Sequence, residues 1–436
     1  MTRNTTPFMR DVYIVDGART PFLKAKGKPG PFSASDLAVQ AGRELLMRQP
    51  FSPKDLNEVV IGCVMPSVNE ANIGRVISLR LGCGKNIPAW TVQRNCASGM
   101  QALDSAAKDI ASGRHDLVLA GGTEAMSRAP LLFQEDYVQW MSGVMAAKDW
   151  KSKAEQWSKF RPSYLKPVIA LLKGLNDPLV NLSMGQTAEN LAYRFHITRE
   201  QMDTFSLESH QLASAAQENH HFGEVLSLFG AHSDFYITDE GVRRDSSVEK
   251  LATLKPFFDK KFGSVTAGNS SQVSDGAALV LLASKEAIDK YQLPVLARIV
   301  DIEWAGVEPA EMGLGPVLAT GNLLKRQQLE FNNIDYWEIN EAFAAQVLGC
   351  LAAWESDEYC QKNLGLNHAL GSIDRSKLNV DGGAIALGHP VGASGARIAL
   401  HLAQILKREK AQKGVATICI GGGQGGAMLI ENVSGV

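Results

Sequence analysis

An internal repeat constrains the fold of this chain more than any other feature of its sequence. Five pieces recur in the same order in both halves. They are a buried strand (11–17 and 296–302), an apolar helix (36–48 and 316–326), a turn with a strand (51–62 and 331–340), a small-residue helix start (96–99 and 392–395) and a strand that ends in glycines (116–126 and 415–428). Because the strands are almost continuously apolar, the repeat predicts two similar α/β units built on mostly parallel sheets.

A long segment between the two halves departs from the repeat. It holds an aromatic and basic stretch, a helical run and a polar connection. Within the helical run, Thr198 and Gln201 have the spacing of a helix-capping pair. The predicted units are a first half (1–125 and 273–294), an inserted loop domain (126–272) and a second half (295–436), with a smaller insertion at 356–377.

Composition narrows the classes of function that remain. The 436 residues carry 44 Lys or Arg and 46 Asp or Glu, so the chain lacks the basic excess that a nucleic-acid-binding protein needs. We find no run of 18 apolar residues, which argues against a transmembrane helix. The first residues show no apolar region with a cleavage site, so we expect no secretory signal peptide.

The six cysteines are sparse, and none forms a C-x2-C pair. This spacing argues against a disulfide framework and against a zinc site, and it favours a reducing compartment. We therefore expect a cytoplasmic protein with no bound metal. For each cysteine taken alone, the simplest interpretation is a small buried hydrophobic side chain.

The two repeated helix starts carry side chains that suit nucleophilic catalysis. Cys96 opens the first, where backbone N–H groups and the helix dipole are expected to lower the pKa of its thiol. His389 lies between a glycine and a proline at the second, which is unusual for a core histidine. If the two halves pack as pseudo-twofold mates, His389 would deprotonate Cys96. The simpler alternatives are a packing cysteine and an exposed loop histidine.

Two further strand ends carry candidate site residues. Cys419 lies where α/β sheets place ligands, and a modest pKa shift would let its thiol move protons. The glycines from Gly421 onward offer backbone N–H donors to an oxyanion. Asn340 would hold a water or polarise a carbonyl, with a helix N-cap as its alternative role. Residues 421–426 also match G-x-G-x-x-G, but the ten residues after them do not supply the helix, strand and acid that a dinucleotide site needs.

Taken together, the motifs of this chain resemble those of the thiolase family along essentially its whole length. In order they are Asn-Cys-Ala-Ser-Gly (95–99), Gly-Gly-Thr-Glu-Ala-Met (121–126), Gly-Asn-Ser-Ser (268–271) with Asp-Gly-Ala-Ala (275–278), Asn-Glu-Ala-Phe (340–343), Gly-His-Pro-Val-Gly-Ala-Ser-Gly (388–395) and Cys-Ile-Gly-Gly-Gly-Gln-Gly (419–425). The combination is far more specific than any single motif. The resemblance implies a duplicated, five-layered α-β-α-β-α fold, with a loop domain inserted in the first half.

The resemblance also implies a role for each candidate. Cys96 is similar to the family nucleophile that carries the acyl group as a thioester, and His389 to the histidine that activates it and donates to one oxyanion hole. Asn340 resembles the asparagine that holds a water in that hole. Cys419 resembles the acid–base that exchanges a proton with the acetyl-CoA carbon. The backbone N–H groups of Cys96 and Gly421 would form a second oxyanion hole.

The implied reaction is 3-ketoacyl-CoA + CoA = acyl-CoA + acetyl-CoA, by a ping-pong mechanism. Coenzyme A and its thioesters are substrates, and no cofactor is permanently bound. The implied contacts to coenzyme A are Ser271 near the pantetheine, Arg243 near the nucleotide, and Phe258, Met184 and Phe343 as apolar lining. Ser183 departs from the small biosynthetic thiolases, which have a histidine there, and this argues against strict acetoacetyl specificity.

One stretch of the predicted loop domain resembles the β-subunits of fatty-acid-oxidation complexes, around Ser158-Lys159-Phe160-Arg161. Residues 148–173 hold seven Lys or Arg and two acids, interleaved with aromatic side chains. Such a stretch fits a membrane surface or the α-subunit of an oxidation complex. The alternative is a lid that packs its aromatic side chains on its own domain. Those β-subunits often carry histidine in place of Asn340, which counts against the complex.

We expect a thiolase of fatty-acid β-oxidation that forms a homodimer or homotetramer. The first alternative is an acetyl-CoA C-acetyltransferase that makes or cleaves acetoacetyl-CoA. A decarboxylating ketoacyl synthase shares the fold but is not expected to have a cysteine at position 419. A non-catalytic lipid-binding protein or complex subunit would be expected to lose Cys96 or His389. A Cys-His-Asn protease would show neither this duplication nor this elbow.

Overall fold

A computed structural model describes residues 10–433, and its main feature is one mixed sheet of ten strands. The strand order is β12-β13-β14-β11-β1-β10-β5-β3-β4, and β2 pairs with β10 outside this path. The strands are β1 (Val12–Arg19), β2 (Leu23–Lys24), β3 (Glu58–Gly62), β4 (Ala89–Val92), β5 (Leu117–Ala125), β10 (Ser274–Ala283), β11 (Ala297–Gly306), β12 (Tyr336–Ile339), β13 (Lys413–Ile420) and β14 (Gln424–Glu431). The two halves join edge to edge, where β1 pairs with β11.

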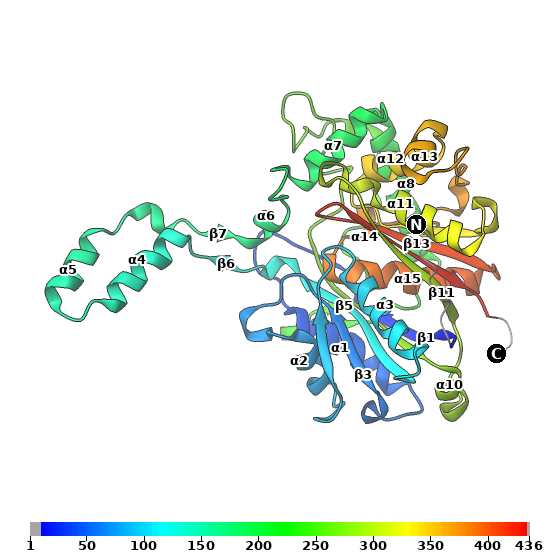
Figure 1. Ribbon diagram of the computed structural model, residues 1–436, viewed down its shortest axis with the longest axis horizontal. Helices are drawn as coiled ribbons and strands as arrows, with labels where there is room; N and C mark the ends of the chain where they lie inside the picture. Colours follow the sequence, from blue (N-terminus) through cyan, green and yellow to red (C-terminus); the bar gives the residue numbers. More distant parts are fainter. Residues whose placement is uncertain (1–9, 434–436) are drawn as a thin grey trace.

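Helices cover both faces of each half of the sheet, which gives five layers (Figure 1). The outer helices of the first half are α1 (Ala34–Met47) and α2 (Ile73–Arg80). The central helices are α3 (Ser98–Ala111) and α15 (Val391–Arg408), and α15 contacts strands of both halves. The outer helices of the second half are α11 (Gly315–Gln327) and α12 (Ala344–Trp354). Three large apolar clusters fill the spaces between these layers, and the predicted duplicated α/β fold is confirmed.

The prediction of mostly parallel sheets is wrong. Only β3 with its neighbours β4 and β5, and β12 with β13, pair in parallel, whereas the other main pairs are antiparallel. Strands covered by helices on both faces are apolar throughout. The hydrophobic pattern therefore does not distinguish parallel from antiparallel pairing. Similarly, 415–428 is not one strand but β13 and β14, joined by a turn in which Gly422 and Gly423 have φ of 93° and 81°. The G-x-G-x-x-G match therefore lies in a strand–turn–strand unit and does not open a helix.

The segment predicted as a loop domain contains two long helices beside the second half. They are α7 (Met184–Arg194) and α8 (Arg199–Glu218), and the capping pair predicted for α8 is confirmed. The remaining helices are α4 (Glu135–Ala146), α5 (Trp150–Ser158), α6 (Ala170–Gly174), α9 (Val248–Ala252), α10 (Lys285–Tyr291), α13 (Asp357–Leu364) and α14 (Ala384–Leu387). The shortest strands pair with each other, as β6 (Leu131–Leu132) with β7 (Val168–Ile169) and β8 (Leu228–Phe229) with β9 (Phe235–Tyr236). Among the described helices, none has both the length and the apolar character needed to cross a bilayer.

A buried imidazole connects this segment to the second half. His401 on α15 is fully buried, with Nδ1 3.0 Å from a carboxylate oxygen of Glu224 and Nε2 3.1 Å from one of Asp381. Burial alone would lower the pKa of His401, but the two carboxylates outweigh it and raise the pKa to about 9. His401 is therefore an imidazolium at neutral pH. Its charge, together with Arg19 beside Glu224 and Arg408 beside Asp381, compensates the burial of both acids.

We expect replacement of this imidazolium to destabilise the fold in a pH-dependent way. His401→Gln removes one cation from two buried carboxylates, of which Glu224 keeps Arg19 and Asp381 keeps Arg408. The lost charged hydrogen bonds should cost about 1.5–3 kcal/mol. Because the pKa is raised in the folded state, this contribution is complete below the unfolded value of about 6.5 and is lost as pH rises through about 9. Urea unfolding should therefore show a large difference from wild type at about pH 6 that shrinks near pH 10. The exposed His368→Gln serves as the control, and a difference independent of pH would contradict the assignment.

Candidate active site

Cys96 lies on a sharp turn directly before α3. The turn is tight, since Asn95 has a φ of 41° and its side-chain amide donates to the carbonyl oxygen of Gly421 at 2.7 Å. The backbone N–H of Gly421 also contacts the Cys96 thiol, which is only partly exposed. The thiol predicted as nucleophile therefore lies against the β13–β14 turn of the other half.

The expected lowering of the Cys96 pKa is wrong. Burial raises the pKa of this thiol, and the contact with the Gly421 N–H offsets only part of the rise. A helix N-terminus stabilises a thiolate, but removal of water from the thiol opposes it more strongly here. Cys96 is therefore protonated at neutral pH, and it needs a base to take its proton when it attacks.

His389 has the protonation and tautomer of such a base. It is buried, and burial together with the nearby charge of Arg397 lowers the pKa of its imidazole to about 3, so the ring is neutral. Its Nδ1 lies 2.6 Å from the Ser394 hydroxyl, which itself donates to the carbonyl oxygen of Pro390 at 3.0 Å. Since the hydroxyl proton is already used, Nδ1 must carry the ring proton. Nε2 then has a free lone pair, and it contacts no polar partner in the described chain.

The two repeated helix starts meet at the centre of the molecule. A Cβ atom on Gly99 would lie 2.9 Å from the carbonyl oxygen of Gly392, and one on Gly395 would lie 2.6 Å from the backbone nitrogen of Met100. Only glycine permits this approach. In the repeat the counterpart of Cys96 is Gly392, so His389 lies three residues before the position that matches the cysteine, on the facing elbow.

Cys419 is fully buried near the end of β13, close enough to Cys96 for the two thiols to interact electrostatically. Burial raises the pKa of Cys419 well above its usual value, and the thiols of Cys96 and Cys350 raise it further. The modest shift toward neutral pH that we expected is therefore wrong. A thiol that keeps its proton is suited to donating it to a carbanion that forms nearby.

Asn340 follows β12 and is fully buried. Its backbone N–H donates to Thr417 at 2.9 Å, but neither polar atom of its side-chain amide has a partner in the described chain. The alternative role as a helix N-cap is not realised, because α12 begins at Ala344 and its N-cap is Phe343. An unpaired amide in a buried position is costly unless a water or a substrate oxygen completes it.

The short segment Ser271–Gln272 lies between the loop that carries Asn340 and the loop that carries His389. The backbone N–H of Ser271 donates to Ala342 at 3.0 Å, and the backbone N–H of His389 donates to Gln272 at 3.2 Å. These bonds attach the Ser271–Gln272 segment to the two loops that carry Asn340 and His389. The side-chain amide of Gln272 donates to Gly241 at 3.0 Å, which also brings the 241–243 loop to this place.

The predicted apolar lining gathers beside the glycine turn. The rings of Phe258 and Phe343 pack edge to face with centroids 5.9 Å apart, and a Cβ atom on Gly185 would collide with Phe258. The sulfur of Met184 lies 3.2 Å from where a Cβ atom of Gly421 would be. Ser183 is the N-cap of α7, where its hydroxyl accepts from the Gln186 N–H.

Two charged residues near the candidate site were not predicted from the sequence. Lys24 is half buried, and burial followed by the charge of Arg243 lowers its pKa, so the two cations lie close together. Glu124 is fully buried at the end of β5 and accepts from the backbone N–H groups of Val64 at 2.8 Å and Met65 at 3.0 Å. Burial raises the pKa of Glu124 to about 7. A lone acid inside an apolar strand was the available signal for Glu124, whereas nothing distinguishes Lys24 from nearby surface lysines.

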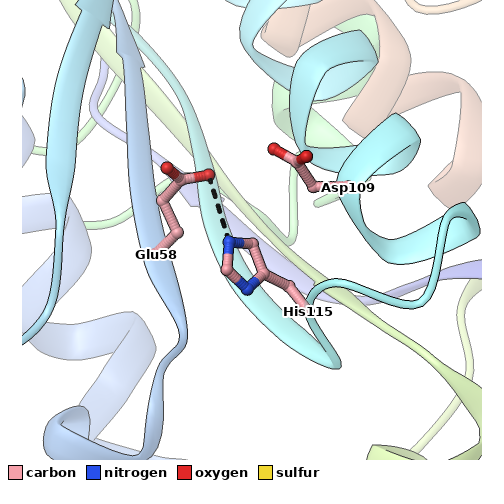
Figure 2. Close-up of side chains that lie close together, drawn as sticks. All are labelled: Glu58, Asp109 and His115. Carbon is pink, nitrogen blue, oxygen red and sulfur yellow. Dashed lines mark ion pairs between the residues drawn. The ribbon is translucent and has the colours of Figure 1, made fainter.

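A group of Glu58, Asp109 and His115 has the residue types of a metal site but lies elsewhere (Figure 2). Its His115–Glu58 contact spans 3.8 Å, and Glu58 also accepts from the Trp90 indole at 3.0 Å. Asp109 lies near the C-terminal end of α3, about 20 Å along the helix from Cys96. This group therefore takes no part in the candidate active site.

We expect the Ser394 hydroxyl to be needed for the tautomer of His389. Ser394→Ala removes the acceptor for Nδ1–H, so the ring loses its orientation and its preference for a free Nε2. Turnover should fall about tenfold or more while the urea midpoint changes little. The rate of Cys96 alkylation, followed against pH, measures the base directly. Unchanged turnover in Ser394→Ala would show that another group fixes the imidazole.

Comparison with known proteins covers nearly the whole chain. The family model "Thiolase, N-terminal domain" matches residues 12–286, and "Thiolase, C-terminal domain" matches 293–432. The mitochondrial 3-ketoacyl-CoA thiolase of Rattus norvegicus is 38% identical over 98% of this chain and 99% of its own length. The mitochondrial trifunctional enzyme subunit beta of Bos taurus is 36% identical over 98% of this chain and 89% of its own length.

Solved structures agree with these relatives. Human mitochondrial 3-ketoacyl-CoA thiolase in complex with CoA has a TM-score of 0.84 and 35% identity, covering 99% of this chain and 100% of that one. An acetyl-CoA acetyltransferase from Syntrophomonas wolfei has a TM-score of 0.85 and 34% identity, covering 98% and 100%.

The expected cytoplasmic location is contradicted, because the relatives from Rattus norvegicus and Bos taurus are mitochondrial. Reduced cysteines indicate a reducing compartment but do not say which one. The related expectation about a signal peptide concerns the first residues, of which 1–9 lie outside the described part of the chain.

Proposed function

This chain belongs to the thiolase family, and we propose that it is a degradative 3-ketoacyl-CoA thiolase whose acyl group is carried on Cys96. As a thiolase it is an acyltransferase that uses coenzyme A compounds as substrates, without a permanently bound cofactor. One observation supports the proposed mechanism above all. Cys96 contacts the Gly421 N–H and lies near the Cys419 thiol, and the facing helix start carries the neutral His389.

In the first half-reaction, the Cys96 sulfur attacks the 3-keto carbon while Nε2 of His389 takes the thiol proton. The resulting oxyanion is stabilised by donors, for which His389 and the water held by Asn340 are the proposed groups. Collapse breaks the carbon–carbon bond and expels the enolate of acetyl-CoA. The N–H groups of Cys96 and Gly421 stabilise that enolate, and Cys419 gives its proton to the carbon. The proton held by His389 then passes to the Cys419 thiolate, which restores both groups before the second half-reaction.

In the second half-reaction, the thiol of free CoA attacks the thioester on Cys96. His389 takes the CoA proton, and the acyl group leaves as acyl-CoA while Cys96 regains its thiol. Covalent capture splits one difficult transfer into two easier steps, so initial rates should follow ping-pong kinetics.

Coenzyme A would lie along the groups on one side of this centre. Phe258, Met184 and Phe343 provide an apolar wall beside Gly421, which suits the pantetheine arm, with Ser271 next to it. Arg243 and its neighbour Lys24 provide two close positive charges, which suit the phosphates of the nucleotide. Lys24 is an addition to the predicted set.

The second candidate is an acetyl-CoA C-acetyltransferase, which the likeness to the Syntrophomonas wolfei enzyme favours. A thiolysis assay with free CoA separates the two, by comparing acetoacetyl-CoA with a long-chain 3-ketoacyl-CoA. A clear preference for the long chain supports β-oxidation, in agreement with Ser183 in place of the histidine of short-chain enzymes. Activity confined to acetoacetyl-CoA would establish the acetyltransferase instead.

We also propose that the active protein is a homodimer or homotetramer and that it binds an α-subunit of the β-oxidation type. The α-subunit is suggested by the similarity to the trifunctional enzyme subunit beta. The three predicted units, with boundaries at 126, 273 and 295, remain part of this proposal. Light scattering of the pure protein tests the oligomer, and co-purification with a candidate α-subunit tests the partner.

A further inference from the structure

The most prominent feature that thiolysis does not explain is an arm that leaves the body of the molecule. We define the arm as residues 131–173. It begins with β6, which pairs with β7 near its end, and its last residues lie in α6. It carries α4 and α5 at its far end. Figure 1 shows α4 and α5 well clear of the body, with only α6 near it. The packing partners of α4 are α5 and the turn at 162–165.

The arm has its own small aromatic core, which explains how it keeps its shape at a distance from the body. Trp140 is the one buried side chain of the arm, and it packs against the rings of Trp157, Phe160 and Tyr164. The indole N–H of Trp140 donates to Gln156 at 2.8 Å, which ties α4 to α5. The predicted packing of aromatic side chains on their own domain therefore occurs, and it is confined to the arm.

Outside this core, the arm exposes a large amount of apolar surface. Met145 and Trp150, at the far end, are 80% and 75% exposed. The other exposed large apolar side chains are Leu131, Leu132, Phe133, Val138, Trp157, Leu165, Ile169 and Leu172. A patch of this extent on a soluble protein marks an interaction surface.

The same arm is basic toward its second half. Its seven cations lie at Lys148, Lys151, Lys153, Lys159, Arg161, Lys166 and Lys173, against four acids in the whole arm, Glu135, Asp136, Asp149 and Glu155. Only Lys159 forms an ion pair within the described chain, with Glu155 at 2.9 Å. Asp149 is occupied as the N-cap of α5, where it accepts from two backbone N–H groups. Glu135 and Asp136 lie in the first turn of α4, away from this basic stretch in sequence. The excess positive charge of residues 148–173 is therefore available to an external anion.

From this combination we propose that the arm docks this thiolase on the surface of an anionic lipid bilayer. Exposed indole and leucine side chains enter the headgroup boundary, while lysines beside them meet lipid phosphates. The apolar side chains are spread along both strands and both helices of the arm, whereas a protein partner is usually met by one compact anchor cluster. The docking is peripheral, and it does not depend on the mechanism at Cys96.

Sedimentation of the purified full-length protein with vesicles tests this proposal. Vesicles of phosphatidylcholine with phosphatidylglycerol should bind it, and phosphatidylcholine alone should bind much less. Lys151→Gln with Lys153→Gln should weaken binding about 30-fold, because each surface cation contributes about 1 kcal/mol. Met145→Ser with Trp150→Ser should weaken it about tenfold or more, because two apolar anchors are lost.

Matched changes on the body serve as controls. Lys407→Gln with Lys410→Gln removes two exposed charges there, and Met47→Ser with Tyr193→Ser removes two exposed large side chains. These controls should bind vesicles as wild type does, and all four variants should keep thiolysis within about twofold of wild type. Failure of the wild-type protein to bind anionic vesicles, or equal weakening by arm and body variants, would overturn the proposal. If the arm variants instead lose a co-purifying protein subunit while vesicle binding is unchanged, the arm is a protein interface.

Discussion

Cys96→Ser is expected to lower thiolysis by at least about 10³-fold. Serine has nearly the same shape, but its hydroxyl is a far weaker nucleophile than a thiol, and His389 with a pKa near 3 is too weak a base to ionise it. Burial already holds the Cys96 thiol protonated, so the reaction depends on the ease with which sulfur gives up its proton during attack. Steady-state thiolysis of acetoacetyl-CoA or a longer 3-ketoacyl-CoA measures the loss.

The control for this experiment is Cys360→Ser. The Cys360 thiol is also buried and donates to a backbone carbonyl, but it lies on α13, outside the candidate site. This variant should retain activity close to that of wild type. Substantial turnover in Cys96→Ser would mean that the acyl group is carried elsewhere.

Cys419→Ala should separate the two steps that the active site performs. Without this thiol no group donates a proton to the acetyl-CoA carbon, so carbon–carbon cleavage should slow by about 10²–10⁴-fold. Acylation of Cys96 from a simple acyl-CoA needs no such proton, and it should continue. Single-turnover measurements with acetyl-CoA and with a 3-ketoacyl-CoA distinguish these steps.

Loss of volume is the main alternative explanation for a defect in Cys419→Ala. Cys350 is an equally buried thiol close to Cys419, so Cys350→Ala leaves a similar cavity without removing the proposed acid. We expect Cys350→Ala to retain the carbon–carbon step. If Cys419→Ala instead blocked acylation from acetyl-CoA, Cys419 would act on Cys96 and not on the acetyl-CoA carbon.

The fold could be predicted from sequence because the repeat is a global constraint. Five pieces in one order make α1 the counterpart of α11 and α3 the counterpart of α15, without any knowledge of how the strands pair. Strand direction could not be predicted in the same way, because β10 and β14 are as apolar as parallel strands. The turn at Gly422 and Gly423 was hidden for a related reason, since small apolar residues continue on both sides of it.

The identities of the candidate site residues could be predicted from motifs, but their electrostatics could not. The position of Cys96 at a helix start predicts a lowered pKa. Burial between the two halves instead raises the pKa of this thiol. Similarly, the neutral state of His389 depends on burial and on Arg397, which the sequence places only eight residues away without showing its direction. Lys24 and Glu124 were missed because their importance arises from neighbours that are distant in sequence.

The arm shows the same limit in another form. Its basic and aromatic composition was visible in the sequence, and it left a membrane, a partner and a packed lid as alternatives. Only the structure shows that Trp140 gathers the aromatic rings within the arm while Met145 and Trp150 remain outside. The distinction depends on which side chains find partners, and spacing along a short helix does not determine that.

The most direct test of the central claim is mass spectrometry of the protein after incubation with acetyl-CoA in the absence of free CoA. The Cys419→Ala variant is the best material, since it should accept the acyl group but use it slowly. We expect one acetyl group per chain, on the peptide that contains Cys96, and we expect added CoA to remove it. An acetyl group on another residue, or none on a protein that still turns over, would contradict the thioester mechanism.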